Sequence, residues 1–215
     1  MPRPVPPPPP RVHYVGLDLG QAADFSALSV VEARGERLEL VFLHRWELGT
    51  RYPAIVGHVL KLVRQEPLSW PTLALDQTGV GAAIVDLFRQ ADLRATLKAV
   101  HITAGSKVTC DDGVWNVPKR ELVGSLQAAF QTGRLRIAPD LPYSEVLEEE
   151  MLAFRVKVTT AGNEVFESWR ERDHDDLVLS VAMAVWAAGR FGDSDPGEPL
   201  TLGHRPNPCG DWWRW

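Results

Sequence analysis

The stretch HYVGLDLG at residues 13–20 is a short apolar run that closes with an aspartate and a glycine. Its length and composition predict a buried β-strand over His13–Leu19, with Asp18 at the strand's end. The stretch TLALD at residues 72–76 has the same form, and it places Asp76 at the end of a second strand, before the glycine turn Gly79–Gly81. Either aspartate alone would suit a turn, where its side chain can bind the backbone. Because ligand sites in α/β sheets gather at the carboxyl ends of strands, the two together predict one site.

A third acidic segment, Asp173-His174-Asp175-Asp176, leads directly into the apolar run at residues 177–188. That run is apolar almost all round and predicts a helix buried on several sides. One aspartate would cap such a helix, but three acids in four residues exceed what capping needs. Two carboxylates about 4 Å apart repel by roughly 4 kcal/mol at an effective dielectric constant of about 20. A cation would reverse this repulsion, and oxygen donors suit hard divalent ions such as Mg²⁺ or Mn²⁺.

The rest of the chain alternates between strand and helix patterns. Two β-rich runs, Ser26–Ala33 and Leu38–Trp46, flank Gly35 and predict a hairpin. Three antiparallel strands followed by alternating helices and strands predict an α/β fold, with a mixed five-stranded sheet and helices on both faces. Beyond these, a further strand is expected at 96–103 and a second hairpin at 155–169. Four helices are expected before the last one: at 52–65, from the Gly79–Gly81 turn to about residue 91, at 119–132 and at 141–154.

The 215 residues suit one domain with tails, and 45% hydrophobic with 24% charged residues is typical of a globular protein. Residues 1–12 are rich in proline and predict an extended leader or linker, residues 13–191 the folded domain, and residues 192–215 an irregular tail. Two cysteines are too few for a disulfide framework or a four-cysteine zinc site. No apolar run is long enough to span a bilayer and the N-terminus lacks a signal-peptide core, so we expect no membrane association and a cytoplasmic location, in the host cell if the chain is phage-encoded.

Four motifs together resemble the nuclease domain of phage terminase large subunits, a branch of the RNase H-like (retroviral integrase) superfamily. They are Gly16–Gly20 with Asp24 and Ser26, Leu75–Gly81, Val117–Leu122 and His174–Leu177. The resemblance spans about His13 to Phe191. It implies an RNase H-like fold and a metal-dependent endonuclease that cleaves double-stranded DNA during genome packaging. It also implies two divalent ions, Mg or Mn, with Asp18 bridging both, Asp76 binding one, and Asp175 or Asp176 binding the other.

The resemblance also implies partners: a packaging ATPase domain, a portal, or a small terminase subunit. This chain has no G-x-x-x-x-G-K-[ST] segment, so we expect it to be either an isolated domain of a larger terminase, with the proline tract as the remnant of a linker, or a free-standing relative. Where some members of the family carry a further acid or histidine in the last helix, this chain has the apolar Leu179. The second ion would then depend on Asp175 and Asp176 alone. A capping role for one of these two would leave the other for the metals, and we favour Asp176.

Several other residues are candidates for supporting roles. Asp24 and His174 are possible auxiliary residues, and His174 is equally compatible with a plain surface position. Glu145 and Glu148–Glu150 predict an exposed helix face. Candidates for contact with DNA phosphates, each equally compatible with solvated surface charge, are Lys107, Lys119, Arg120, Arg170 and Arg172.

Three alternative functions remain open from the sequence. The segment Gly16–Gly20 also resembles the first phosphate loop of actin-like and sugar-kinase ATPases, although those proteins duplicate the core that this chain can hold once. A Holliday-junction resolvase would share the fold and the acids. A non-catalytic module would keep the fold and only bind DNA or a portal. Turnover of ATP, cleavage restricted to four-way junctions, and absence of metal-dependent cleavage distinguish the three.

Overall fold

The computed structural model describes residues 10–20, 24–68, 70–78, 82–160 and 175–192. The expected leader at 1–12 and tail at 192–215 lie almost wholly outside these residues, as do the Gly79–Gly81 turn and positions 161–169 of the expected hairpin. Within the described residues, no helix is long and apolar enough to cross a membrane.

One eight-stranded mixed sheet forms the centre of the domain, in the order β6-β7-β5-β4-β1-β2-β3-β8. Strands β1, β2 and β3 are antiparallel, β4, β5 and β7 continue parallel to β1, and the sheet closes with β6 antiparallel to β7 and β8 parallel to β3. The strands are β1 Val12–Asp18, β2 Ala27–Arg34, β3 Arg37–Arg45, β4 Thr72–Asp76, β5 Thr96–Thr103, β6 Thr109–Asp111, β7 Val114–Pro118 and β8 Leu135–Ile137.

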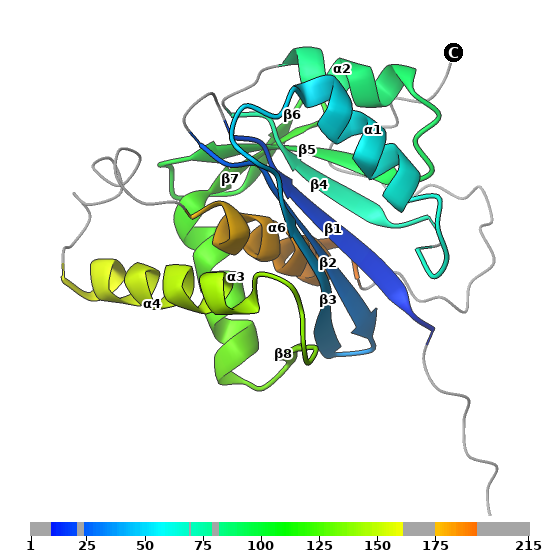
Figure 1. Cartoon of the computed structure of the whole chain (residues 1–215). Helices are drawn as coiled ribbons and strands as arrows, with labels where there is room; N and C mark the ends of the chain where they lie inside the picture. Colours follow the sequence, from blue (N-terminus) through cyan, green and yellow to red (C-terminus); the bar gives the residue numbers. More distant parts are fainter. Residues whose placement is uncertain (1–9, 21–23, 69, 79–81, 161–174, 193–215) are drawn as a thin grey trace, which may run out of the picture.

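Helices cover both faces of this sheet (Figure 1). On one face, α1 (Tyr52–Leu62) and α2 (Ala82–Gln90) close a hydrophobic cluster that includes Val15 and Leu17 of β1. On the other, α3 (Lys119–Gln131), α4 (Ser144–Thr160) and α6 (Asp176–Phe191) close a second cluster that includes Tyr14. This alternation follows from the two-residue period of a strand, which sends successive side chains to opposite faces.

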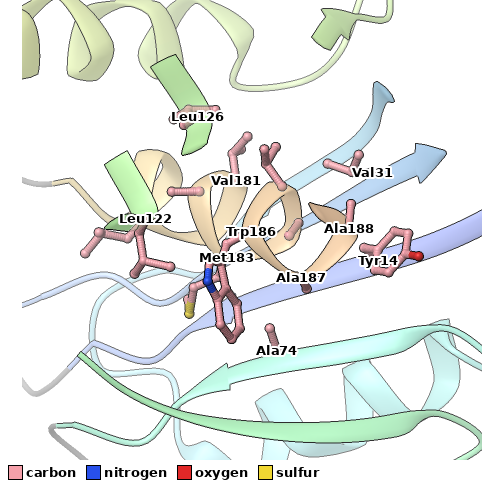
Figure 2. Packing of buried hydrophobic residues seen from close by; sticks show 14 of the residues in the cluster. Tyr14, Val31, Ala74, Leu122, Leu126, Val181, Met183, Trp186, Ala187 and Ala188 are labelled. Atoms are coloured by element: carbon pink, nitrogen blue, oxygen red, sulfur yellow. The ribbon is translucent and has the colours of Figure 1, made fainter. Parts of the chain in front are cut away.

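Helix α6 is the central element of the second cluster. Every residue from Asp176 to Ala188 is buried, as its apolar pattern predicts. Figure 2 shows Val181 and Trp186 of this helix between Leu122 and Leu126 of α3 and the strands of the sheet. The ring of Trp186 also lies edge-on to that of Trp115, with centroids 5.9 Å apart.

The expectation of five strands was incomplete. The five predicted strands are present as β1 to β5, and the hairpin around Gly35 is confirmed by antiparallel pairing of β2 with β3. The three additional strands, β6, β7 and β8, have three to five residues each. Runs this short contain too few alternating positions to be recognised as strands from the sequence.

The predicted boundary between the 141–154 helix and the 155–169 hairpin was wrong. Helix α4 continues to Thr160, so residues 155–160 are helical. The run Arg155–Thr160 is rich in β-branched residues, which favour strands only weakly and give way to context.

Candidate active site

The two strand-end aspartates lie side by side. Leu17 of β1 is the parallel partner of Leu75 in β4, which places Asp18 next to Asp76 at the carboxyl ends of neighbouring strands. Both side chains lie on the face of the sheet that α6 covers, since Tyr14 and Ala74, an even number of residues earlier on each strand, pack there. Asp18 is only 6% exposed and Asp76 only 9%.

The start of α6 brings a third carboxylate to this pair. Asp176, the first residue of the helix, is 5% exposed. Burial, and then the charges of Asp76, Asp176 and Asp175, hold the pKa of Asp18 well above its ordinary value. The other three aspartates predicted from the sequence are therefore all within electrostatic reach of Asp18.

A close approach between β1 and α6 makes this arrangement possible. A Cβ atom added at Gly16 would lie 1.9 Å from the carbonyl oxygen of Ser180 and 3.0 Å from the backbone nitrogen of Ala184. Only glycine permits a helix to lie this close to the strand. Gly16 therefore determines how near the first turn of α6 can come to Asp18.

Asp76 is held by the loop that follows its strand. The backbone N–H of Thr78 donates to Oδ1 of Asp76 at 2.8 Å, and the Thr78 hydroxyl donates to the same oxygen. The hydroxyl in turn accepts the N–H of Ile102 at 2.8 Å, which ties the loop to β5. Burial raises the pKa of Asp76, while these hydrogen bonds and the nearby charge of His101 lower it. His101 was not recognised from the sequence, because nothing local marks a histidine in the middle of a strand as a neighbour of Asp76.

The adjacent pair Asp175 and Asp176 divides between two environments. Asp175 Oδ2 lies 2.9 Å from Nζ of Lys119, and both of these side chains are mostly shielded from solvent. Burial, and then the charges of Asp175 and Asp24, raise the pKa of Asp176 to about 7, and the charge of Arg45 lowers it. Asp24, an exposed residue, is thereby placed near the site, as an auxiliary residue would be.

The expectation that Glu150 belongs to an exposed helix face was wrong. Its neighbours Glu148 and Glu149 are exposed, but Glu150 is buried and faces α6. Its Oε2 accepts the backbone N–H groups of Leu177 and Val178, each at 3.1 Å. Burial is the main reason that its pKa is raised to about 7. The signal in the sequence was the spacing of three residues from the core residue Leu147, which puts both on one side of a helix.

The basic candidates fall into three groups. Lys119 contacts Asp175, as described. Arg120 is exposed and donates to the carbonyl oxygen of Ser106 at 2.7 Å, and Lys107, next along the chain from Ser106, is also exposed. The remaining candidates lie outside the described residues: Arg170, Arg172 and His174.

The carboxylates do not surround a ready-made cation position. Among the described residues, no group of three or more His, Cys, Asp or Glu side chains is arranged to hold a metal ion. Burial is the main reason that the pKa values of Asp18, Asp76 and Asp176 are raised, and the charges of neighbouring aspartates raise those of Asp18 and Asp176 further.

Comparison with known proteins identifies the fold. No protein-family model matches the chain, and no curated protein sequence matches it either. Among solved structures, the large terminase nuclease of thermophilic phage G20c with bound magnesium superposes with a TM-score of 0.54 over 82% of each chain at 20% identity. The manganese-soaked terminase nuclease domain of human cytomegalovirus gives a TM-score of 0.53 over 85% of each chain at 16% identity.

A longer protein shares the same fold over part of its length. The large terminase of a second thermophilic bacteriophage, in complex with ADP, matches with a TM-score of 0.52 at 13% identity, over 89% of this chain and 42% of that one. At these identities the likeness is one of fold. The chain has the mixed α/β, RNase H-like architecture of terminase nuclease domains, which confirms the predicted fold class.

Proposed function

We propose that the chain is a metal-dependent endonuclease that hydrolyses phosphodiester bonds in double-stranded DNA. The observation that carries the proposal is the burial of Asp18 and Asp76, at the carboxyl ends of β1 and β4, together with Asp176 at the start of α6. The charges of Asp76 and Asp176 raise the pKa of Asp18. Three buried like charges destabilise a fold unless a ligand compensates for them. The fold likeness to terminase nucleases from a phage and from cytomegalovirus supports the same conclusion.

The donor set fits hard divalent cations. All four aspartates offer oxygen ligands, the type that Mg²⁺ and Mn²⁺ prefer. Asp18 would be the ligand shared by two ions, Asp76 a ligand of one, and Asp176, in preference to Asp175, a ligand of the other. When bound, such a pair of ions supplies an activated water and stabilises the leaving oxygen. The likeness to nuclease structures with bound magnesium or soaked in manganese supports this choice of metal.

The other residues of the chain would bind and orient DNA. Lys119 lies against Asp175 and can balance its charge before DNA arrives. Arg120, which contacts the Ser106 carbonyl, and Lys107, which follows Ser106, are both exposed and can reach phosphate oxygens. Asp24 is an auxiliary acid near Asp176, and His101 a neutralising neighbour of Asp76. Arg170 and Arg172, as further phosphate contacts, and His174, as a second auxiliary residue, complete the proposal; all three lie outside the described residues.

We place this activity in phage genome packaging. The folded nuclease unit is assigned to residues 13–191, flanked by the proline-rich leader and the tail. Because the chain spans only 42% of the longer, ADP-bound large terminase, a packaging ATPase domain is the first partner that we propose, followed by a portal and a small terminase subunit.

Incubation of supercoiled plasmid with the protein and Mg²⁺ or Mn²⁺, with and without EDTA, tests the function. We expect cleavage that EDTA abolishes. Asp18→Asn and Asp76→Asn should each lower the rate by more than about 100-fold, since even outer-shell partners of a metal are worth about 10–100-fold. Asp86→Asn, at an exposed position of α2, is the matched control.

Plasmid cleavage, together with assays on four-way junctions and on ATP, decides between the proposed nuclease and its alternatives. If either Asp18→Asn or Asp76→Asn keeps near-normal cleavage, the site assignment is wrong. Cleavage of four-way junctions but not of plasmid would indicate a resolvase instead, and ATP turnover without DNA would indicate an ATPase. No metal-dependent cleavage at all would favour a binding module.

A further inference from the structure

Helix α6 is capped from another helix. Asp175 occupies the N-cap position, yet its side chain makes no capping hydrogen bond. Instead the Glu150 carboxylate of α4 accepts the N–H groups of Leu177 and Val178, which would otherwise lack a partner in the first turn. A residue 26 positions before Asp176 thus holds the turn that carries it.

Arg45 holds Glu150 from the opposite side. Its Nη1 lies 3.5 Å from Oε1 of Glu150, so one carboxylate oxygen contacts Arg45 and the other contacts α6. The guanidinium of Arg45 also lies over the ring of Phe25, 4.3 Å from its centroid, and 5.8 Å from that of Tyr143. Two aromatic contacts and an ion pair leave it little conformational freedom.

Arg45 belongs to the same row of the sheet as the catalytic candidates. Asp18 pairs with Ala27 across β1 and β2, and Ala27 pairs with Arg45 across β2 and β3. Paired residues of antiparallel strands point to the same face, so the row Asp76, Asp18, Ala27, Arg45 runs under the start of α6. Ala27, fully buried, separates the acids from the arginine in this row.

A buried glutamate is an expensive cap. Neutral or exposed residues cap helices without the cost of desolvating a charge, and the nearby Asp176 and Asp175 add repulsion to that cost. A role in stability alone does not account for this choice. The two contacts of Oε2 fix where the first turn of α6 lies, and a role in fixing that position explains why a buried glutamate is used.

We propose that Glu150, oriented by Arg45, is a positioning residue of the nuclease site: it sets the first turn of α6 so that Asp176 lies over Asp18, and neither Asp175 nor Asp176 has to cap the helix. This inference rests on the function proposed above. It assigns Glu150 no contact with metal or DNA. Its prediction is that the reach of the side chain at position 150 determines how well the acids bind a cation.

Two conservative variants separate reach from charge. Glu150→Asp keeps the charge but is one methylene too short for the two N–H groups. Glu150→Gln loses the charge but keeps an oxygen at the same reach. Glu149→Ala, at the exposed neighbouring position, is the control. The probe is Mn²⁺ alone, titrated in the absence of DNA and followed by the rise in each variant's own melting temperature; plasmid cleavage as a function of Mn²⁺ is the second readout.

We expect Glu150→Asp to raise the half-saturating Mn²⁺ concentration by about 10–100-fold, the range for partners that orient metal ligands. Glu150→Gln keeps the contacts with α6 but loses the ion pair with Arg45, so we expect it to raise that concentration by less than about tenfold. A Glu150→Asp variant that melts at a lower temperature but binds Mn²⁺ like the wild type would show a purely structural role and overturn the inference. So would a Gln variant as impaired as the Asp variant.

Arg45→Gln provides an independent test if Glu150→Asp does not fold. It leaves Glu150 in place without its second anchor, and we expect the half-saturating Mn²⁺ concentration to rise by about threefold to tenfold. An unchanged value would overturn the inference. If the wild type itself neither responds to Mn²⁺ nor cleaves DNA, the proposed function fails, and the positioning role with it.

Discussion

At the level of single residues, Asp175 and Asp176 are neighbours in sequence with different partners. Asp175 contacts Lys119 at 2.9 Å, whereas Asp176 is buried, and its charge raises the pKa of Asp18. We expect Asp176→Asn to reduce cleavage by more than about 100-fold and Asp175→Asn by about 10-fold, a value nearer to that of an outer-shell partner. Single-turnover cleavage rates at saturating Mn²⁺ measure the difference. Equal losses in the two variants, with unchanged melting temperatures, would mean that both bind the metals.

At the level of elements, the contact between β1 and α6 depends on a single glycine. A methyl group at Gly16 would overlap the Ser180 carbonyl, so α6 must move away from the strand. We expect Gly16→Ala to lower the free energy of unfolding by about 1–3 kcal/mol or more, the range for overpacking. Cleavage should fall further than stability explains, because the same movement takes Asp176 away from Asp18. Urea denaturation and cleavage rates measure the two effects.

Gly124 of α3 is the matched control for this substitution. It is exposed, and a Cβ there would have no atom within 4 Å. Gly124→Ala should therefore raise the free energy of unfolding by about 0.5–1 kcal/mol, through helix propensity alone. If Gly16→Ala is as well tolerated as Gly124→Ala, the close approach of β1 and α6 is not what positions the site.

At the level of the whole molecule, the buried acids link stability to pH. The pKa values of Glu150 and Asp176 rise from 4.5 and 3.8 to about 7, so the folded protein keeps protons that the unfolded chain has released. Their stabilising effect is complete below about pH 4 and is lost as the pH rises through about 7. Without metal, we expect the melting temperature at about pH 8 to lie at least about 5 °C below that at about pH 5.

Substitution of Glu150 and Asp176, and addition of metal, separate their effect on the pH dependence of stability from that of other titrating groups. Burial lowers the pKa values of His13 and His44, and these residues act in the opposite direction. The double variant Glu150→Gln, Asp176→Asn should flatten the pH dependence, and Mn²⁺ at about pH 8 should restore the wild type's melting temperature. An equally steep decline in the double variant would contradict the assignment of these two acids as its source.

The charge of the whole chain predicts weak binding of DNA. The net charge is −5, so only a few local Lys and Arg residues can neutralise phosphates. With about three to five phosphate contacts, log K should fall with log salt at a slope of roughly −3 to −5. Fluorescence anisotropy of labelled duplex DNA, with Ca²⁺ in place of Mg²⁺, measures this slope. Tight binding at about 200 mM salt would indicate a nuclease that needs no partner to present its DNA.

The sequence by itself predicted the fold class, which the structure confirms, and it supplied the acids that we propose as the site. Short apolar runs that end in Asp18 and Asp76 predict both the strands and their carboxyl ends, because the apolar run of a strand and the residues that end it are local features of the sequence. The apolar run from Leu177 to Ala188 reports a buried helix for the same reason. None of these inferences needs to know which elements meet in space.

Only the tertiary structure decided which partners these acids have. The contacts of Glu150 with α6, of Lys119 with Asp175, and of Arg45 with Glu150 join residues 27, 56 and 105 positions apart. The three short strands β6, β7 and β8 likewise exist by pairing with neighbours in the sheet. A glutamate among glutamates looks solvated in sequence, because a helical pattern gives its spacing but not what it packs against. The burial of Glu150 is set by the packing of α4 on α6, and that packing depends on long-range contacts that no local pattern records.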